Sequence, residues 1–122
     1  MPTTDPSPSH KTLTGKIREA TKALRAGDII FLNPEVIAAD LLKLNCDIQE
    51  VPEILFELLQ KMAPEHYAGT RPPQRSYEED LGGSELYAFK IESKRLGCLI
   101  YLKFALQDGY LWVVSFHENK KE

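Results

Sequence analysis

The C-terminal third of the chain alternates between hydrophobic and polar positions over two segments, 98–106 and 110–118. This alternation predicts two β-strands, and the Gln-Asp-Gly tripeptide at 107–109 predicts a hairpin turn between them. If all three residues form the loop, the glycine takes the corner that needs a positive φ, and Leu106 pairs with Tyr110. The alternative is a two-residue loop made of the Asp-Gly pair alone, which shifts one strand by a residue.

The register decides which side chains share a face, because successive residues of a strand point to opposite sides. With the three-residue loop, one face is apolar and consists of Ile100, Leu102, Phe104, Leu106, Tyr110, Trp112, Val114 and Phe116. The opposite face then carries Tyr101, Lys103, Ser115 and His117, with Tyr101 directly across from Ser115. The two-residue loop would place Tyr101 among the aromatic residues and His117 on the other side. We therefore predict the three-residue loop, with Trp112 in the core.

Upstream of the hairpin, the apolar positions follow a helical period. Residues 12–26 predict an amphipathic helix, Asn33-Pro34 opens a second helix through about Leu44, and Pro52 stands in the first turn of a third. Residues 85–92 alternate and predict a further strand. The order predicts an α+β fold, in which N-terminal helices pack on an antiparallel sheet of at least three strands.

Length and composition indicate one globular domain. The chain has 122 residues, of which 43% are hydrophobic, and we expect a disordered tail over 1–10 before a single domain over 11–122. No apolar run is long enough to span a membrane, and the two cysteines have no metal-like spacing, so we expect reduced thiols in a cytoplasmic protein. The net charge of −3 argues against strong non-specific nucleic-acid binding but leaves room for a local basic surface.

The polar face of the predicted hairpin combines a phenol, an ammonium and an imidazole. An imidazole and a phenol on neighbouring strands can exchange protons near neutral pH, and Lys103 can stabilise charge on a phosphate. These groups suffice for RNA cleavage by attack of the 2′-hydroxyl. Tyrosine, lysine and histidine are also common on exposed sheet faces, and in that alternative His117 is an ordinary surface residue. The long connection 65–84 adds Arg71 and Arg75, which a linker does not need.

Two segments of the hairpin carry a resemblance to a known family. They are 100–103 (IYLK) and 113–118 (VVSFHE). They resemble the C-terminal hairpin of the motility quorum-sensing regulator (MqsR-type) toxins, which are RelE-like mRNA interferases of type II toxin–antitoxin systems. Apolar positions over 22–28, 54–59 and 64–70 are similar to the remainder of that family, so the resemblance covers nearly all of the chain after residue 10.

The resemblance implies a RelE-like toxin domain that cleaves single-stranded mRNA without metal or cofactor and is controlled by a cognate antitoxin. Tyr101 matches the family's hairpin tyrosine, which is thought to serve in acid–base chemistry, and His117 occupies the place of a basic residue. Ala68 stands where the family has a catalytic lysine, so Arg71 or Arg75 would have to replace it.

The predicted site therefore has two parts. The catalytic residues are His117, Tyr101 and Lys103, and the RNA-binding residues are Lys90, Arg71 and Arg75. The alternative function is a non-catalytic scaffold that binds a protein partner through the acidic second and third helices.

Overall fold

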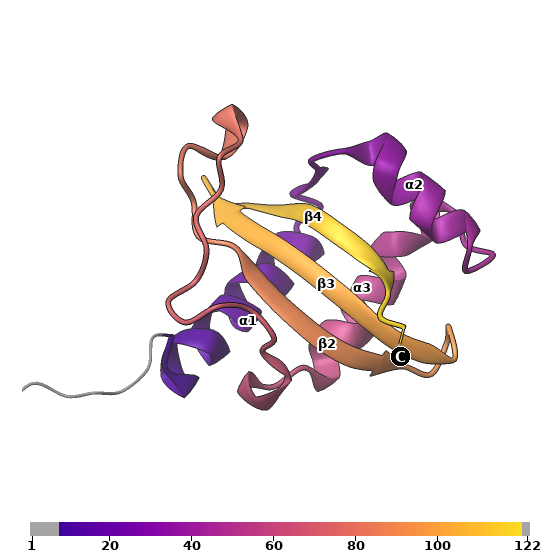
Figure 1. Ribbon diagram of the computed structural model, residues 1–122, viewed down its shortest axis with the longest axis horizontal. Coiled ribbons are helices and arrows are strands. Elements are labelled where there is room, and N and C mark those ends of the chain that lie inside the picture. The colour runs from indigo at the N-terminus through magenta and orange to yellow at the C-terminus, as the bar shows by residue number, and fades with distance from the viewer. Residues whose placement is uncertain (1–7, 121–122) are drawn as a thin grey trace, which may run out of the picture.

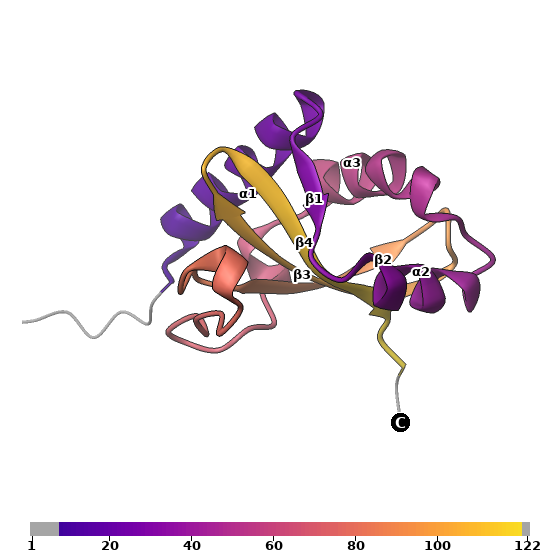
Figure 2. The ribbon, with the colours of Figure 1, turned by 90° about the horizontal axis from the view of Figure 1, so that it is seen from above.

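The structure, a computed structural model, describes residues 8–120 and consists of helices packed on a four-stranded mixed sheet (Figure 1). The predicted α+β fold is confirmed. Two helices, α1 (His10–Arg25) and α3 (Val51–Lys61), cover one face of the sheet. Figure 2 shows the long connection before the second strand on the opposite face. Most of the predicted tail, residues 1–7, lies outside the described residues.

Helix α1 buries the stripe that its sequence predicts. Ser9 caps its start, since the Ser9 hydroxyl accepts from the Thr12 amide at 3.1 Å, and Gly27 with φ +80° follows its end. The buried side chains are Leu13, Ile17, Ala20, Ala23 and Leu24. They meet the stripe of α3, which consists of Val51, Ile54, Leu55, Leu58 and Leu59. Together these two stripes form the helical half of the core.

Helix α2 (Pro34–Leu42) packs beside the last strand. It ends two residues before the predicted Leu44, and Asn45 then turns the chain with φ +56°. Ile37 and Leu41 face the core, whereas Val36 and Leu42 remain 59% and 74% exposed. This helix therefore contributes both to the core and to an apolar outer surface.

The sheet has the order β1-β4-β3-β2. Strands β2 (Tyr87–Ser93), β3 (Cys98–Gln107) and β4 (Tyr110–Glu118) form an antiparallel meander, as predicted. The apolar run after α1 forms β1 (Ile29–Phe31), which adds to the edge of β4 in parallel. Because α2 and α3 separate β1 from the meander in sequence, nothing in the local pattern indicated this pairing.

The β3–β4 turn contains two residues, so the predicted three-residue loop is wrong. Gln107 pairs with Tyr110, and Asp108 and Gly109 both have positive φ, of +54° and +80°. Two left-handed residues in sequence are the signature of a type I′ turn, whose twist matches that of the strands. The Asp-Gly pair is one of the strongest sequences for this turn, and that local preference determines the loop length.

A β-bulge then restores the predicted faces farther from the turn. Phe104 pairs with Val113 but Lys103 pairs with Ser115, so Val114 is an extra residue on β4. Beyond the bulge, Phe116 is fully buried, and Tyr101 shares the other face with His117 as expected. The directly opposed partner of Tyr101 is His117, not the predicted Ser115.

Between the bulge and the turn, the predicted faces of β4 are reversed. Leu111 and Val113 join the main core, whereas Trp112 packs on the opposite face in a small second cluster. The buried members of that cluster are Leu81, Leu86 and Ala105. The prediction that Trp112 lies in the main core is therefore wrong, because the two-residue turn inverts this part of β4.

The connection between α3 and β2 closes over half of the outer face. Tyr67 bridges to Phe89 at the edge of β2, and Arg75 bridges to Glu85. The 3-10 turn Glu79–Leu81 brings Leu81 onto the sheet beside Trp112. This cover lies at the turn end of the hairpin, and no helix within residues 8–120 covers the half of the outer face beyond the bulge (Figure 1).

Two glycine substitutions test this account of the backbone with opposite signs. Gly109→Ala places a side chain at φ +80° and is expected to lower the free energy of unfolding by about 1 kcal/mol. Gly15→Ala in α1 meets no atom within 4 Å and is expected to raise it by about 0.5–1 kcal/mol. Denaturant unfolding of both variants measures the two changes. A neutral Gly109→Ala would contradict the type I′ turn.

Candidate functional site

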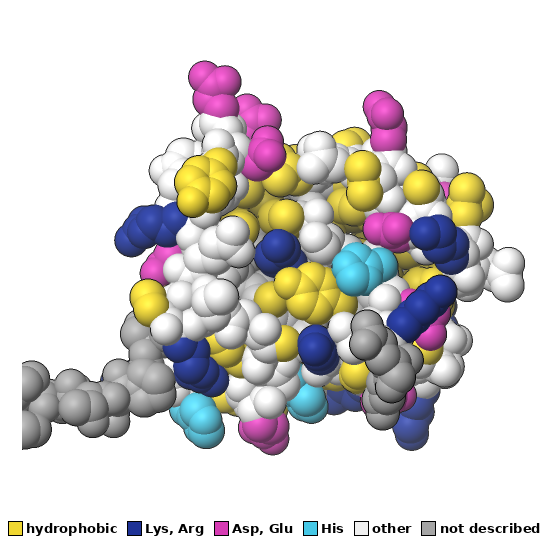
Figure 3. All heavy atoms as spheres, viewed as in Figure 1, with side chains coloured by type: hydrophobic (Ala, Val, Ile, Leu, Met, Phe, Trp, Pro, Cys, Tyr) yellow, Lys and Arg dark blue, Asp and Glu magenta, His cyan; other side chains and the backbone are white. Residues whose placement is uncertain are grey.

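Three predicted site residues form one row across the open half of the sheet. Lys90 on β2 pairs with Tyr101 on β3, and Tyr101 pairs with His117 on β4. Their side chains project away from the helices, because the neighbouring Ile100 and Phe116 are fully buried on the helical side. Figure 3, which views this face, shows a histidine against a hydrophobic centre with basic side chains beside it. Lys90, Tyr101 and His117 are called the outer row below.

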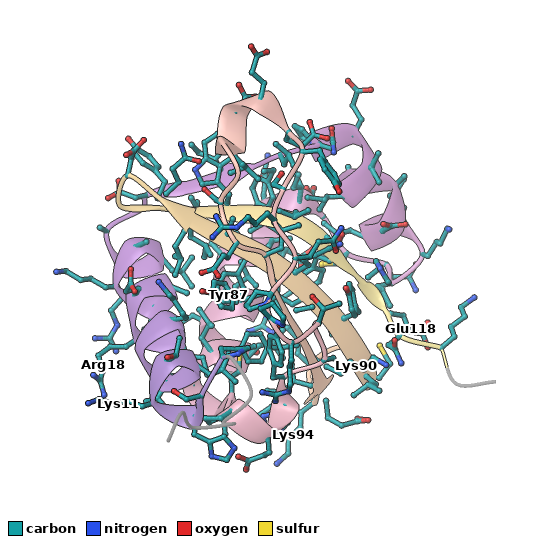
Figure 4. The ribbon with its side chains drawn as sticks, turned by 60° about the vertical axis from the view of Figure 1, so that its left-hand side comes forward. Lys11, Arg18, Tyr87, Lys90, Lys94 and Glu118 are labelled. Carbon is teal, nitrogen blue, oxygen red and sulfur yellow. The ribbon has the colours of Figure 1, made fainter. Side chains whose placement is uncertain are left out.

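Lys103 adds a second ammonium to the same face. It lies two residues from Tyr101 on β3, so its side chain points to the same side, and it pairs with Ser115 on β4. Lys90 and Lys103 therefore flank Tyr101, one on the adjacent strand and one along its own strand. Figure 4 labels Tyr87 and Lys90, which both belong to β2. The Tyr87 end of the strand lies beside α1, and Lys90 lies farther along the strand.

The Tyr101 and His117 rings stack on each other. Their centroids are 5.1 Å apart and their planes differ by 22°. Stacking of this kind orients both rings, and directly opposed positions on neighbouring strands supply the required separation. Both side chains are half-buried, so each presents part of its surface to solvent.

A backbone contact determines which nitrogen of His117 is available for chemistry. The Nδ1 atom lies 3.0 Å from the carbonyl oxygen of Glu118. Because a carbonyl oxygen only accepts hydrogen bonds, Nδ1 carries the proton in this contact and donates it. In the neutral ring, Nε2 then keeps its lone pair. His117 is thus arranged as a proton acceptor through Nε2.

Tyr101 is arranged as a proton donor. Burial raises the pKa of its phenol above the ordinary value, because desolvation disfavours the phenolate. The hydroxyl therefore keeps its proton through the neutral range. The row consequently pairs a base with a protonated phenol, with ammonium groups on either side.

The two predicted arginines are engaged elsewhere. The Arg71 guanidinium lies over the Tyr67 ring at 5.0 Å and donates to the carbonyl of Pro8 at 2.9 Å. Arg75 donates to the carbonyl of Gly83 at 3.1 Å. These contacts hold the connection between α3 and β2, and they do not bring either guanidinium into the outer row.

Ala68, which stands where the resemblance expects a lysine, lies at the edge of the sheet. Its amide donates to the carbonyl of Ala88 at 2.8 Å, and Ala88 pairs with Lys103. At roughly 5 Å per strand spacing, Ala68 is about 10 Å from Lys103. Lys90 is one spacing from Tyr101, so it supplies a cation nearer to the aromatic pair than position 68 does.

No family model matches the chain, and no curated protein matches it. Within residues 8–120, no group of three or more His, Cys, Asp or Glu side chains is placed to hold a metal ion. None of the helices in that range is long and apolar enough to cross a membrane. The outer row is therefore the feature of the described residues that points to a function.

Sequence reasoning missed two residues near the row, Lys61 and His66. They line a cavity with Lys90 at the edge of β2. Lys61 belongs to the last turn of α3, and His66 ends the short 3-10 turn Pro64–His66 that follows it. The signal that could have found them is the short sequence distance between the end of α3 and the segment that bridges to β2.

The two histidines are expected to adopt opposite neutral tautomers. The Nδ1 of His117 faces a carbonyl, whereas the Nδ1 of His66 accepts from the Ala63 amide at 3.0 Å. We expect ring ¹⁵N chemical shifts, measured at a pH where both rings are neutral, to show protonated Nδ1 for His117 and protonated Nε2 for His66. Protonated Nε2 at His117 would contradict its assignment as a base.

Proposed function

We propose that this protein is an endoribonuclease that cleaves single-stranded mRNA by attack of the 2′-hydroxyl on the adjacent phosphorus. The observation that carries the proposal is the stacked Tyr101–His117 pair, with the Nε2 lone pair of His117 free and lysines on either side. The row combines a base, an acid and positive charge within neighbouring positions of three strands. These are the groups that phosphodiester transesterification requires.

In the proposed reaction, two proton transfers accompany the formation of one bond to phosphorus and the breaking of another. His117 Nε2 takes the proton of the 2′-hydroxyl as the new bond from O2′ to phosphorus forms. The bond from phosphorus to O5′ breaks, and the Tyr101 phenol donates its proton to the departing O5′. The alkoxide that leaves is more basic than a phenolate, so a phenol with a raised pKa still transfers its proton to it. Proton transfer from His117 through solvent then restores both groups.

Lys103 and Lys90 stabilise the negative charge that grows on the phosphoryl oxygens. They approach from two sides of Tyr101, one along β3 and one from β2. Since the row itself supplies base, acid and charge stabilisation, we propose that the reaction needs neither metal nor cofactor. In this proposal Lys90 takes the part that the resemblance assigns to the missing lysine at position 68.

The resemblance to MqsR-type toxins suggests the biological setting. In that setting the protein is a cytoplasmic toxin, and a cognate antitoxin controls it by covering the outer row or an adjacent face. The support for this is the hairpin segments 100–103 and 113–118, together with the α+β fold.

The proposal predicts separate effects for three substitutions. With purified protein and an end-labelled single-stranded RNA, His117→Ala is expected to lower the cleavage rate by about 10²–10⁴-fold, the usual contribution of a general base. Tyr101→Phe keeps the stacked ring, removes the proton donor, and is expected to cost about 10²-fold. His10→Ala, an exposed histidine at the start of α1, is the matched control and is expected to leave the rate unchanged.

Thermal unfolding of each variant shows whether the fold is intact. A folded His117→Ala protein that cleaves at the wild-type rate would refute the assignment of the base. Intact RNA after incubation with folded wild-type protein would refute the nuclease.

A second candidate function is a non-catalytic scaffold that binds a basic protein. The observation in its favour is the exposure of Val36 and Leu42 on α2. Leu42 also lines a cavity of about 400 Å³ together with Asp47 and Glu50. Large exposed apolar residues with acidic neighbours suit a partner that is apolar and basic. If wild-type protein leaves RNA intact, pull-down of a basic partner that Leu42→Ser weakens would favour this second function.

A further inference from the structure

A cavity of about 230 Å³ lies beside the outer row, where the edge of β2 meets the residues after α3. Its lining consists of Lys61, His66, Lys90, Ile91, Glu92 and Leu99. Lys90 belongs both to this cavity and to the row, because it pairs with Tyr101 on the neighbouring strand. The cavity therefore adjoins the candidate site through one shared residue, Lys90.

His66 presents a hydrogen-bond donor in this region. Its Nδ1 accepts from the Ala63 amide at 3.0 Å, and a backbone amide can only donate. The proton of the neutral ring is therefore on Nε2. This is the reverse of His117, whose Nε2 is the acceptor, so the two histidines are arranged for different tasks.

The charges of the cavity favour an anion. Two ammonium groups, Lys61 and Lys90, and the Nε2–H of His66 are donors, and Glu92 is the one carboxylate of the lining. Donors of this kind bind phosphate oxygens, and lysine does so as a mobile point charge. The volume is several times the roughly 30 Å³ of a water molecule, so a phosphate group fits. The partly exposed Leu99 side chain adds an apolar surface against which a sugar or base can lie.

We propose that this cavity is a subsite for a second phosphate of the RNA strand, next to the phosphate that is cleaved. The inference rests on the proposed function, and it specifies the path of the RNA strand across the sheet. The strand passes from β4 across β3 and Lys90 to the β2 edge, where Lys61 and His66 hold the neighbouring phosphate. Lys90 lies two strand spacings, about 10 Å, from His117, so a strand crossing the row reaches the cavity directly.

The test measures binding of an RNA that cannot be cleaved. A fluorescent single-stranded hexanucleotide with 2′-O-methyl groups at every position blocks the attack but keeps every phosphate, and anisotropy gives its Kd. Lys61→Gln is expected to raise the Kd about fivefold and to reduce the slope of log Kd against log salt by about 0.7, the value for one phosphate contact on a single strand. Lys43→Gln removes the same charge at the end of α2 and is expected to change neither quantity.

A second variant separates the histidine from folding effects. His66→Asn keeps an acceptor for the Ala63 amide and removes the Nε2–H, so the Kd is expected to rise about threefold without a change in thermal unfolding.

The alternatives give different results. Equal Kd values and salt slopes for Lys61→Gln and Lys43→Gln would overturn the subsite, even if wild-type protein cleaves RNA. Inorganic phosphate that abolishes the Lys61 effect at concentrations too low to displace the hexanucleotide would assign the cavity to a free anion. A polyglutamate peptide that distinguishes the two variants while the hexanucleotide does not would assign it to an acidic protein. If the protein leaves cleavable RNA intact but binds the hexanucleotide in a manner that depends on Lys61, the nuclease proposal is refuted and the subsite is retained.

Discussion

The β3–β4 hairpin pairs in two registers separated by one extra residue, Val114, and the side chains of the candidate site depend on this bulge. Near the turn, Asp108 and Gly109 impose a type I′ loop that directs Val113 into the main core and Trp112 away from it. Without the bulge, that register would continue and place Tyr101 and His117 on opposite faces. With it, both rings stack on the outer face while Phe116 completes the core.

The bulge also divides the outer face into two regions with different roles. On the turn side, Trp112 and Ala105 are covered by Leu81 and Leu86, which close the second cluster. On the other side, no such cover from the described part of the chain lies over the outer row, and polar side chains on adjacent strands can act together. Near the turn, β3 and β4 therefore pack against apolar side chains, and beyond the bulge they present polar side chains on an accessible surface.

The sequence was sufficient for the parts of this structure that follow from local periodicity. The stripes of α1 and α3 and the meander order come directly from apolar spacing, and the Asp-Gly pair was recognised as a possible two-residue loop. The bulge was not predictable, because Val114 ends a continuous apolar run over 110–114, in which one extra residue leaves no mark. The parallel pairing of β1 with β4 is a long-range contact without a local signal. The faces of Tyr101 and His117 were predicted correctly, although from a loop length that proved wrong.

Although the chain is acidic overall, its outer face carries a local group of lysines. The net charge is −3, and two carboxylates of α3, Glu53 and Glu57, are paired with Arg95 on its surface. The lysines of the outer face stand apart from that group, on β2 and β3. A local basic surface attracts a phosphate strand only over about a Debye length, roughly 8–10 Å at physiological salt. RNA recognition by this protein is therefore expected to depend on a few contacts near the row instead of on overall charge.

The measurement that tests the central claim most directly is the chemistry of the RNA ends left by wild-type protein in the presence of EDTA. Attack by the 2′-hydroxyl, with His117 as base and Tyr101 as acid, predicts a 2′,3′-cyclic phosphate on one fragment and a 5′-hydroxyl on the other, at an undiminished rate. Replacing the attacking 2′-hydroxyl by hydrogen is predicted to abolish cleavage at that position alone. Fragments with 3′-hydroxyl and 5′-phosphate ends, or activity that disappears with EDTA and returns with Mg²⁺, would contradict the account.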